Sequence, residues 1–316
     1  MIRTICLKTM REVEPPAFSV LCLGNFDGVH IGHRALVAET LRQKELLSSA
    51  FNGIQSGAWL FSEPPTRSLF PTAIPQLTST EEKLQQFAAL GLDYAFLADF
   101  SQLRNCEAAD FVERVLKKAC HCVYTVCGFN FRFSKNAMAD AAMLVRLMGG
   151  LGTVLDCVTL NGSPVSSSAI RSLLSEGNIE TANRMLGHPF SHTALVHHGK
   201  AIGQTIGIPT INQFFQNQAV RPKGGIYVSR TWIGGTPYSS VSNIGSRPTF
   251  DDGNTINCET HIIGYNGDLY GTRLTVEFHK RLRDEKRFPS LQALTRQLKI
   301  DISQATAYFC PNGESV

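Results

Sequence analysis

The stretch Phe18-Ser-Val-Leu-Cys-Leu-Gly-Asn-Phe-Asp-Gly-Val-His-Ile-Gly-His33 decides the fold of the first half of the chain. Its apolar beginning stops at Gly24, as a buried parallel strand does before a turn. Residues 34–48 then have the composition and the rough apolar stripe of a helix. A strand, a glycine-rich turn and a helix in this order predict a phosphate site, because the free N–H groups at a helix N-terminus attract anions.

The turn itself carries residues suited to binding a phosphate. Gly24, Gly28 and Gly32 let the backbone bend sharply and come close to a ligand. His30 and His33 lie three residues apart on the first helical turn, so both imidazoles can reach one phosphate group. The chain has no GxxxxGK[ST] P-loop and no complete GxGxxG dinucleotide motif. The alternative interpretation is a pair of histidines that only cap the helix.

Strands and helices alternate through the rest of the first half. The pattern predicts strands at 57–61, 94–97 and 123–127, and helices at 80–90 and 108–117. Ser79 or Thr80 is suited to cap the first of these two helices. Alternation of this kind predicts an α/β domain with a parallel sheet between two layers of helices.

The character of the sequence changes near residue 186. From there the chain is rich in Gly, Thr, Val and Ile, with turns every 8–12 residues, which is typical of an antiparallel barrel or sandwich. Apolar residues at helical spacing close the chain, at Leu291, Leu294, Leu298, Ile302, Ala305 and Phe309. We therefore expect two domains, residues 1–185 and 186–316, the second mostly antiparallel β with a C-terminal helix.

Composition limits the classes of partner. The net charge is +4 in 316 residues and no Lys/Arg cluster stands out, so we expect no nucleic-acid partner. No apolar run approaches the roughly 18 residues of a membrane span, and residues 1–12 do not resemble a signal peptide. We expect a soluble, cytoplasmic protein with small-molecule substrates, while the oligomeric state stays open.

The nine cysteines indicate reduced thiols rather than disulfides, because they are spread from Cys6 to Cys310. Only Cys120-His121-Cys122 is clustered tightly enough to suggest a metal. This cluster lacks a second pair of ligands, and in a strand the two thiols would point away from the imidazole. We therefore expect a structural role for it.

Three segments of the first half resemble a known family. The stretch from Gly24 to His33 resembles the opening signature of the bacterial bifunctional riboflavin kinase/FMN adenylyltransferases (FAD synthetases), which are HxGH nucleotidyltransferases. Ser166-Ser-Ser-Ala-Ile-Arg171 resembles their second motif, SSTxIR, and Gly128-Phe-Asn-Phe-Arg-Phe133 resembles a third. The resemblance implies a Rossmann-like adenylyltransferase domain with catalytic roles for His30 and His33. It also implies ATP binding by Gly24, Asn25, Phe26, Asp27, Gly28, Gly32, Asn130, Ser166, Ser167 and Arg171.

The reaction that this resemblance implies is an in-line attack of the FMN phosphate on the α-phosphorus of ATP, with pyrophosphate leaving. His30, His33 and Arg171, with Mg²⁺, would neutralise the developing charge. Ser134 and Ala139 stand where the family commonly has glycines. If those glycines adopt positive φ angles, this loop must take another path.

The second half resembles the flavokinases. His198-Gly-Lys-Ala-Ile-Gly-Gln-Thr-Ile-Gly-Ile-Pro-Thr-Ile-Asn212 is similar to their signature ending in PTxN, with Gln204 where arginine is usual. The resemblance implies ATP binding by Gly199, Gly203, Gly207, Thr210 and Asn212. Thr210 and Asn212 are alternate residues of an expected strand, and their hard oxygen atoms suit Mg²⁺.

Two further residues complete the expected kinase site. Glu259, in Cys258-Glu-Thr-His261, is the candidate general base for the riboflavin 5′-hydroxyl. Arg283, in Arg283-Asp-Glu-Lys-Arg-Phe288, is a candidate flavin contact, the alternative being a surface ion pair. ATP would be the co-substrate, Mg²⁺ the cofactor, and riboflavin, FMN and FAD the substrates and products. The alternatives are a riboflavin kinase with an impaired adenylyltransferase domain, and a non-catalytic flavin or nucleotide sensor.

Overall fold

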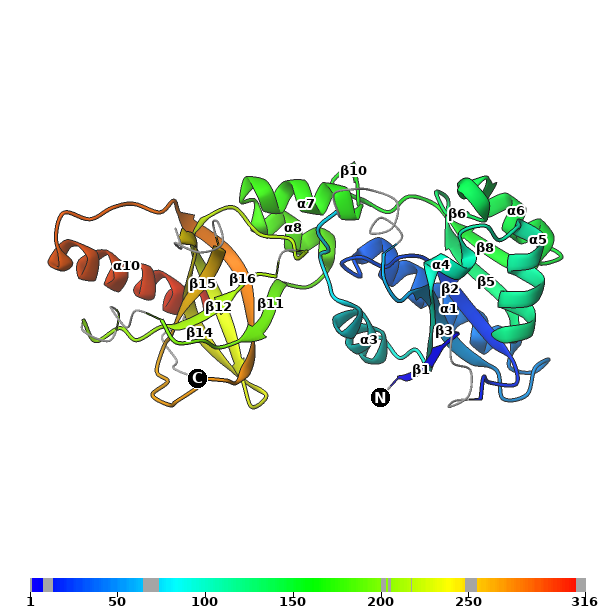
Figure 1. Cartoon of the computed structure of the whole chain (residues 1–316), viewed down its shortest axis with the longest axis horizontal. Coiled ribbons are helices and arrows are strands. Elements are labelled where there is room, and N and C mark those ends of the chain that lie inside the picture. The colour runs from blue at the N-terminus through cyan, green and yellow to red at the C-terminus, as the bar shows by residue number, and fades with distance from the viewer. Residues whose placement is uncertain are drawn as a thin grey trace. The chain divides into compact units, whose positions relative to one another are not determined.

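A computed structural model describes residues 2–7, 14–64, 74–199, 203, 206–216, 218–247 and 255–310. Its contacts divide the chain into two compact units, Met1–Ser167 and Ser168–Val316. Figure 1 labels their elements along the chain. In the part of the chain described, no helix combines the length and the apolar character that crossing a membrane requires.

The first unit contains the predicted parallel sheet. Six strands pair in the order β1-β4-β3-β2-β5-β8, and every pairing is parallel. The chain order reverses between β2 and β5, which makes the carboxyl ends of these two strands the topological switch point. The strands are β1 (Arg3–Cys6), β2 (Ser19–Leu23), β3 (Gln55–Phe61), β4 (Tyr94–Ala98), β5 (Cys122–Gly128) and β8 (Gly152–Leu155).

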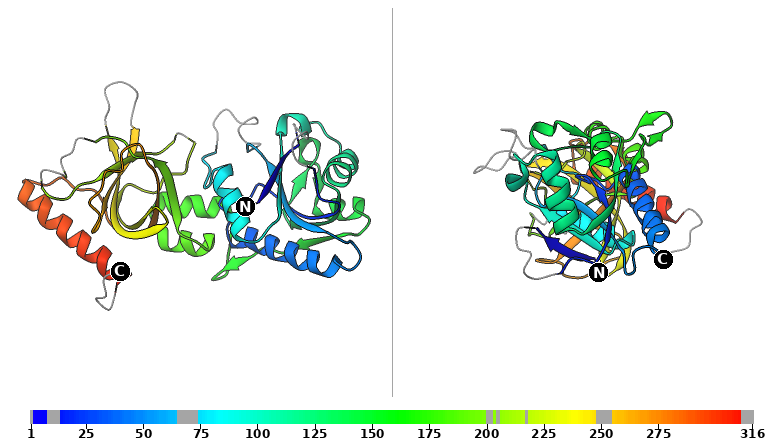
Figure 2. Two further views of the ribbon diagram at one scale, coloured as in Figure 1. Left: turned by 90° about the horizontal axis from the view of Figure 1, so that it is seen from below. Right: turned by 90° about the vertical axis from the view of Figure 1, so that its right-hand side faces the viewer.

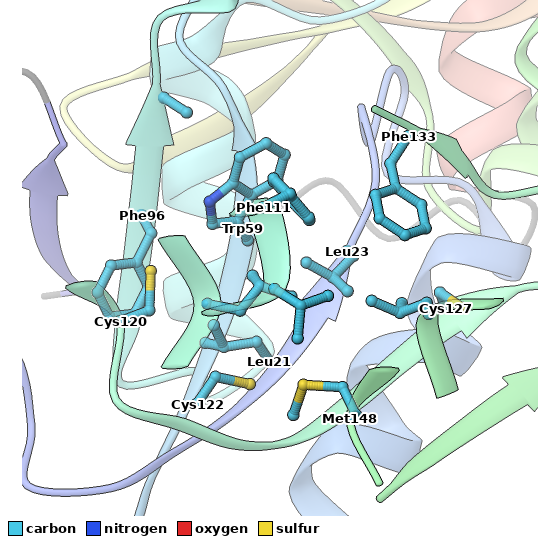
Figure 3. Packing of buried hydrophobic residues seen from close by; sticks show 14 of the residues in the cluster. Leu21, Leu23, Trp59, Phe96, Phe111, Cys120, Cys122, Cys127, Phe133 and Met148 are labelled. Atoms are coloured by element: carbon cyan, nitrogen blue, oxygen red, sulfur yellow. The ribbon is translucent and has the colours of Figure 1, made fainter. Parts of the chain in front are cut away.

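Helices cover both faces of this sheet. Val20 and Cys22 face α1 (Ile31–Leu47) and α3 (Thr80–Ala89). Leu21 and Leu23 face the other way, as the alternation of a strand requires. That second face packs against α5 (Ala108–Asp110), a π-helix η1 (Phe111–Ala119) and α6 (Ala141–Leu147), and Figure 3 shows this core from close by.

Two local details correct or refine the sequence predictions. Ser79 caps α3 in a capping box with Glu82, as the sequence suggested. The helix predicted at 108–117 is mostly a π-helix, which ends where the Cys120 N–H bonds the Val115 carbonyl. Cys120 precedes β5 instead of lying in a strand, and His121 has a φ of 50°. The two thiols nevertheless lie in one core cluster while His121 is exposed, as expected.

The second unit is an antiparallel sheet that nearly closes on itself. The order is β11-β16-β13-β14-β15-β12, and Figure 2 shows the resulting barrel. Its two outer strands meet where Gln213 donates to the carbonyl of Ala194 at 2.7 Å, beside a bridge between His197 and Asn212. The strands are β11 (Phe190–Leu195), β12 (Ile211–Phe214), β13 (Gly225–Ile233), β14 (Thr236–Arg247), β15 (Thr255–Ile262) and β16 (Arg273–Arg283).

In the part of the second unit that the structure describes, three helices with defined bounds accompany the barrel. The predicted final helix is confirmed as α10 (Leu291–Phe309), and its Ala305 packs against Val228 and Val241 on the outside of β13 and β14. Helices α7 (Ser167–Glu176) and α8 (Ile179–Leu186) precede the barrel. The remaining short elements are α4 (Phe100–Leu103), β6 (Arg132–Phe133), η2 (Lys135–Ala137), β7 (Ala139–Asp140), β9 (Thr159–Leu160) and β10 (Ser163–Pro164).

Candidate active sites

A cavity of about 750 Å³ lies at the carboxyl ends of β2, β3 and β5 in the first unit. Ligands of open α/β sheets bind at this edge, beside the topological switch point. Its lining includes Gly24, Asn25 and His33 from the glycine-rich turn, and Asn130 from the third motif. The sequence motifs thus converge on one hollow, although they are about 100 residues apart.

The two histidines stack at the start of α1. His30 is the N-cap, and its Nδ1 accepts a hydrogen bond from the His33 N–H at 3.3 Å. The ring centroids are 3.6 Å apart and the ring planes differ by 13°. Because Nδ1 of His30 is an acceptor, a neutral ring carries its proton on Nε2, which leaves that nitrogen as a donor. Both imidazoles lie on the helix end that favours an anion.

Burial keeps this pair of imidazoles uncharged near neutral pH. Desolvation lowers the pKa of His30 to about 4. Desolvation also lowers the pKa of His33 well below its ordinary value, with smaller contributions from His30 and Lys83. The buried Nδ1 of His33 has no hydrogen-bond partner among the described residues. Near neutral pH the two histidines are therefore uncharged hydrogen-bonding groups.

We call the turn from Gly24 to His33 the phosphate cradle. Its middle residues, Phe26 and Asp27, face away from the cavity. Phe26 is fully buried and packs edge-on against Phe87, so its backbone alone can reach a ligand. The Asp27 carboxylate accepts hydrogen bonds from the N–H groups of Leu77 at 2.8 Å and Thr78 at 3.3 Å. Neither residue lines the cavity. Phe26 and Asp27 therefore hold the backbone shape of the turn, in which Gly28 has a φ of 86°.

The second motif begins a helix, as predicted. Ser167 starts α7 and its hydroxyl donates to the Asp27 carbonyl at 2.8 Å, which ties the motif to the turn. Ser166 precedes the helix, and Arg171 lies within it, in the part assigned to the second unit. The roles of Ser166 and Arg171 in phosphate binding stay predictions.

The loop after the third motif keeps an unusual backbone without glycine. Ser134 has φ 67° and ψ −179°, a region that residues with a side chain rarely occupy, and Asn136 and Ala137 both have φ 55°. Ala139 instead lies buried in the short strand β7. The loop therefore adopts a positive φ at Ser134 despite the added Cβ, and Ser134 still lines the cavity.

Aromatic rings form part of the cavity lining, which we call the aromatic wall, and the sequence analysis missed most of them. Trp59 at the end of β3 packs edge-on against Phe111 of the π-helix, with centroids 5.1 Å apart. Phe133 lies 5.3 Å from Phe111, and Figure 3 shows these three side chains gathered at one side of the core. Strand ends rich in aromatic residues were the available signal. Such a wall suits a flat aromatic ligand.

In the second unit, register aligns several predicted residues across the barrel. Successive cross-strand pairs make up one row: Arg283, Ile226, Asn243, Glu259 and Asn212. Directly paired residues project on the same face, and neighbouring strands lie about 4.8 Å apart. Glu259 therefore lies between Asn212 and Asn243, and Arg283 lies about 14 Å away, at three such spacings. We call these five residues, of which only Ile226 is apolar, the polar row.

The environment of Glu259 is amide-rich and partly shielded from water. Its Oε1 accepts a hydrogen bond at 3.1 Å from Nδ2 of Asn257, which is buried. Asn243, its neighbour in the row, donates to Glu285 at 2.9 Å. Sequence reasoning did not select Asn257. Its position two residues before Glu259 on the same strand, and hence on the same face, was the signal.

The glycine segment of the PTxN motif packs against the residues predicted to hold a metal. A Cβ at Gly199 would collide with the amide of Asn212, and one at Gly203 would collide with the Ile208 carbonyl. Gly203 lies beside the Thr210 hydroxyl, and Gly207 has a φ of 73°. Thr210 directly precedes β12 rather than lying in it, and it lines a second cavity of about 360 Å³.

Arg283 is held by the final helix. Its Nη2 lies 2.6 Å from Oδ2 of Asp301, and its Nε bonds the other carboxylate oxygen at 3.1 Å. Asp301 is only 1% exposed and also accepts from Gln297 at 2.9 Å. The ion pair is thus partly buried rather than a surface pair. A flavin contact by Arg283 stays a prediction, and it would use the flat face of the guanidinium.

Among the residues described, no three His, Cys, Asp or Glu side chains come together as metal ligands. The thiols of Cys120 and Cys122 are both buried. Burial raises the pKa of Cys122 to about 12. Thr210 and Asn212 offer neutral oxygen atoms, a set that fits Mg²⁺ because this ion takes few protein ligands beside phosphate and water.

Comparisons with known proteins agree with this division of sites. The FAD synthetase family model matches residues 13–169, and the riboflavin kinase family model matches residues 186–309. A solved structure from Streptococcus pneumoniae, named a macrolide-efflux protein, matches 99% of this chain and 100% of its own. It is 29% identical in sequence, with a TM-score of 0.86, and so it has the same fold.

Curated relatives match over almost their whole length. A bifunctional riboflavin kinase/FMN adenylyltransferase of Pseudomonas fluorescens is 33% identical, covering 93% of this chain and 94% of its own. The protein of the same name from Escherichia coli K12 is 34% identical over the same shares. Nothing in these comparisons supports a protein with a single working site. The chain belongs to the family of bifunctional riboflavin kinase/FMN adenylyltransferases.

Proposed function

We propose that the two units carry out consecutive reactions. The second unit transfers the γ-phosphoryl group of ATP to the 5′-hydroxyl of riboflavin and so forms FMN. The first unit transfers the adenylyl group of a second ATP to the FMN phosphate, which forms FAD and releases pyrophosphate. The observation that carries this proposal is the convergence within each unit: stacked histidines beside a cavity in one, and Glu259 between two asparagines in the other.

In the kinase reaction, Glu259 is the general base. Its carboxylate accepts the proton of the 5′-hydroxyl as that oxygen attacks the γ-phosphorus, and Asn257 holds the carboxylate in place. A positioned base of this kind contributes about 10²–10⁴-fold to a rate. Gly199, Gly203 and Gly207 allow the backbone to lie close over the phosphates, and Arg283 contacts the flavin at the far end of the polar row.

Mg²⁺ would be held by Thr210 and Asn212 together with the phosphates of ATP. It would supply positive charge to the phosphate oxygens during transfer. The neighbouring glycines leave room for the phosphates beside these two side chains, because any Cβ at Gly199 would meet Asn212.

In the adenylyltransferase reaction, the turn from Gly24 to His33 holds the phosphates of ATP. Neutral His30 and His33 donate hydrogen bonds to oxygens whose charge grows as pyrophosphate leaves. Asn130, Ser166 and Ser167 complete the nucleotide site of the first unit, and phosphate binding by Arg171 of α7 stays a prediction. The isoalloxazine ring of FMN stacks against the aromatic wall, so that the FMN phosphate points toward the turn.

We keep the domain boundary at residue 186 as a prediction. The first compact unit ends at Ser167, whereas the two family models leave residues 170–185 between them unmatched. Within this segment, Asn183 donates to the Phe278 carbonyl at 2.8 Å and accepts from the Phe190 N–H at 2.7 Å. Helix α8 therefore packs on the barrel that follows it.

A chromatographic time course tests the proposal. The purified chain with riboflavin, ATP and Mg²⁺ should produce FMN first and FAD later. Glu259→Gln should reduce FMN formation by about 10²–10⁴-fold, because it removes the base and keeps the shape. The same variant should still convert added FMN to FAD.

The matched control is Glu277→Gln, a glutamate on β16 beside His279 and outside the polar row. It should form FMN at the wild-type rate. Equal loss in both variants would contradict the role of Glu259. FMN that accumulates without FAD would contradict the second reaction and would point to the loop at Ser134.

A further inference from the structure

Lys83 is a buried cation that no step of the proposed reaction uses. It lies on α3 with only 4% of its surface exposed. Lysine is almost never buried to this extent unless something compensates its charge. Its Nζ donates a hydrogen bond at 2.9 Å to the carbonyl of Asn25, which is the second residue of the glycine-rich turn and lines the cavity.

The electrostatic neighbours of Lys83 all belong to the phosphate cradle. Burial lowers the pKa of Lys83, and the nearby Asp27 carboxylate works in the opposite direction. Lys83 in turn helps to lower the pKa of His33, as a positive charge does to an imidazole that would otherwise gain a proton. The charge of Lys83 is thus felt at a side chain that lines the cavity.

The cradle needs a permanent positive charge from some source. His30 and His33 are neutral near pH 7, so they provide donors without net charge. Asp27, which is only 7% exposed, adds the negative charge of its carboxylate to the turn. This carboxylate would repel a triphosphate bound on the turn, and Lys83 offsets that repulsion in addition to the positive charge predicted for Arg171 and Mg²⁺. Among the described residues, Lys83 is the buried lysine at this turn.

We propose that Lys83 is a positioning residue of the adenylyltransferase site, which fixes the Asn25 carbonyl and supplies the standing positive charge beneath the phosphate cradle. This inference rests on the proposed function of the first unit. Lys83 acts through the turn and through its field, and it does not contact the reacting atoms.

Two substitutions separate the charge of Lys83 from its hydrogen bond. Lys83→Gln keeps a donor for the Asn25 carbonyl but removes the charge, whereas Lys83→Met removes both. We expect both variants to lower kcat/KM for FAD formation by about 10–100-fold, the effect of losing a cation a few ångströms from a phosphate in a shielded site. The loss should appear mainly in KM for ATP, because a standing charge acts on the bound phosphates before the chemical step.

Controls within the same chain detect damage to the fold. Riboflavin phosphorylation by the second unit should stay unchanged in both variants. Lys44→Met removes another lysine of the first unit, which does not line the cavity and whose Nζ lies 2.6 Å from the Asp93 carboxylate. This variant should leave FAD formation unchanged.

Lys83→Arg restores a cation that keeps its proton at high pH. In the wild type, FAD formation should therefore fall at alkaline pH as Lys83 loses its proton, and this fall should disappear in Lys83→Arg.

Calorimetric titration with inorganic pyrophosphate gives a readout that does not depend on turnover. Its affinity should drop in Lys83→Gln and Lys83→Met but not in Lys44→Met, even if the wild type formed no FAD and the proposed function failed. Wild-type FAD formation with wild-type pyrophosphate affinity in Lys83→Gln would overturn the electrostatic role. An alkaline fall that persists unchanged in Lys83→Arg would overturn it as well.

Discussion

At the scale of single residues, the stacked pair His30 and His33 shows how burial selects a protonation state. Both rings stand at a helix N-terminus, where a second positive charge would be unfavourable, and desolvation adds to that effect. An uncharged imidazole can still donate one hydrogen bond to a phosphate oxygen. The positive charge needed by the nucleotide then has to come from other groups, such as Lys83.

The low pKa of His30 predicts a loss of stability in mild acid. Because burial lowers the folded-state pKa to about 4, only the unfolded chain gains a proton between its ordinary value near 6.5 and that pH. Stability should fall as pH drops through this window, by about 2 kcal/mol between pH 7 and pH 5 from this group alone. His30→Asn keeps a side-chain acceptor at the N-cap and should remove that part of the loss.

Calorimetric unfolding of the full chain at several pH values measures this effect. The difference in stability between wild type and His30→Asn should shift in favour of the variant as the pH falls. A difference that stays constant from pH 7 to pH 5 would contradict the burial of a neutral His30.

At the scale of elements, α10 depends on a charge that lies almost out of reach of water. Asp301 is 1% exposed and bonds Arg283 with both carboxylate oxygens. Asp301→Asn should destabilise the second unit by roughly 2–4 kcal/mol, because it leaves a partly buried guanidinium without its counter-charge. Denaturant titration of the full chain measures the loss.

The same variant also tests the flavin contact of Arg283. If Asp301 aims the guanidinium at the flavin, Asp301→Asn should raise KM for riboflavin and leave conversion of added FMN to FAD intact. Asp284→Asn is the control, because its carboxylate pairs with Arg281 and is exposed. Unchanged stability in Asp301→Asn would contradict the assignment of a buried ion pair.

Elements with a clear hydrophobic period were predictable from the sequence. The strand before Gly24, the capping box at Ser79 and the apolar stripe of α10 all depend on neighbouring residues, so they can be recognised locally. The π-helix at Phe111–Ala119 could not be predicted, because its composition is that of an ordinary helix and only its hydrogen bonds differ. The path at Ser134 could not be predicted either, since serine has no preference for a positive φ.

The candidate sites divide in the same way. Contiguous motifs identified His30, His33 and Glu259. The aromatic wall and Lys83 come from separate elements that meet only in the fold, whereas Asn257 has a local signal, its place two residues before Glu259 on the same strand. Long-range contacts of this kind leave no local pattern, because any of several aromatic or basic residues could have occupied these places.

At the scale of the whole molecule, the account rests on two independent sites that share one chain and one intermediate. FMN made on the barrel is the substrate of the α/β unit, and nothing in the chemistry requires FMN to stay bound between the steps. Variants that disable one site should therefore leave the other intact, and two such variants together should restore the full sequence of reactions.

The most direct test is a mixing experiment with Glu259→Gln and His33→Asn. Alone, Glu259→Gln should form FAD from riboflavin about 10²–10⁴-fold more slowly than the wild type, because FMN formation limits it. Alone, His33→Asn should accumulate FMN and form about 10²–10³-fold less FAD. Mixed in equal amounts with riboflavin, ATP and Mg²⁺, the two should form FAD after FMN has been released into solution. FAD formation from riboflavin at the wild-type rate by Glu259→Gln alone, or a mixture that accumulates FMN without forming FAD, would contradict two independent sites.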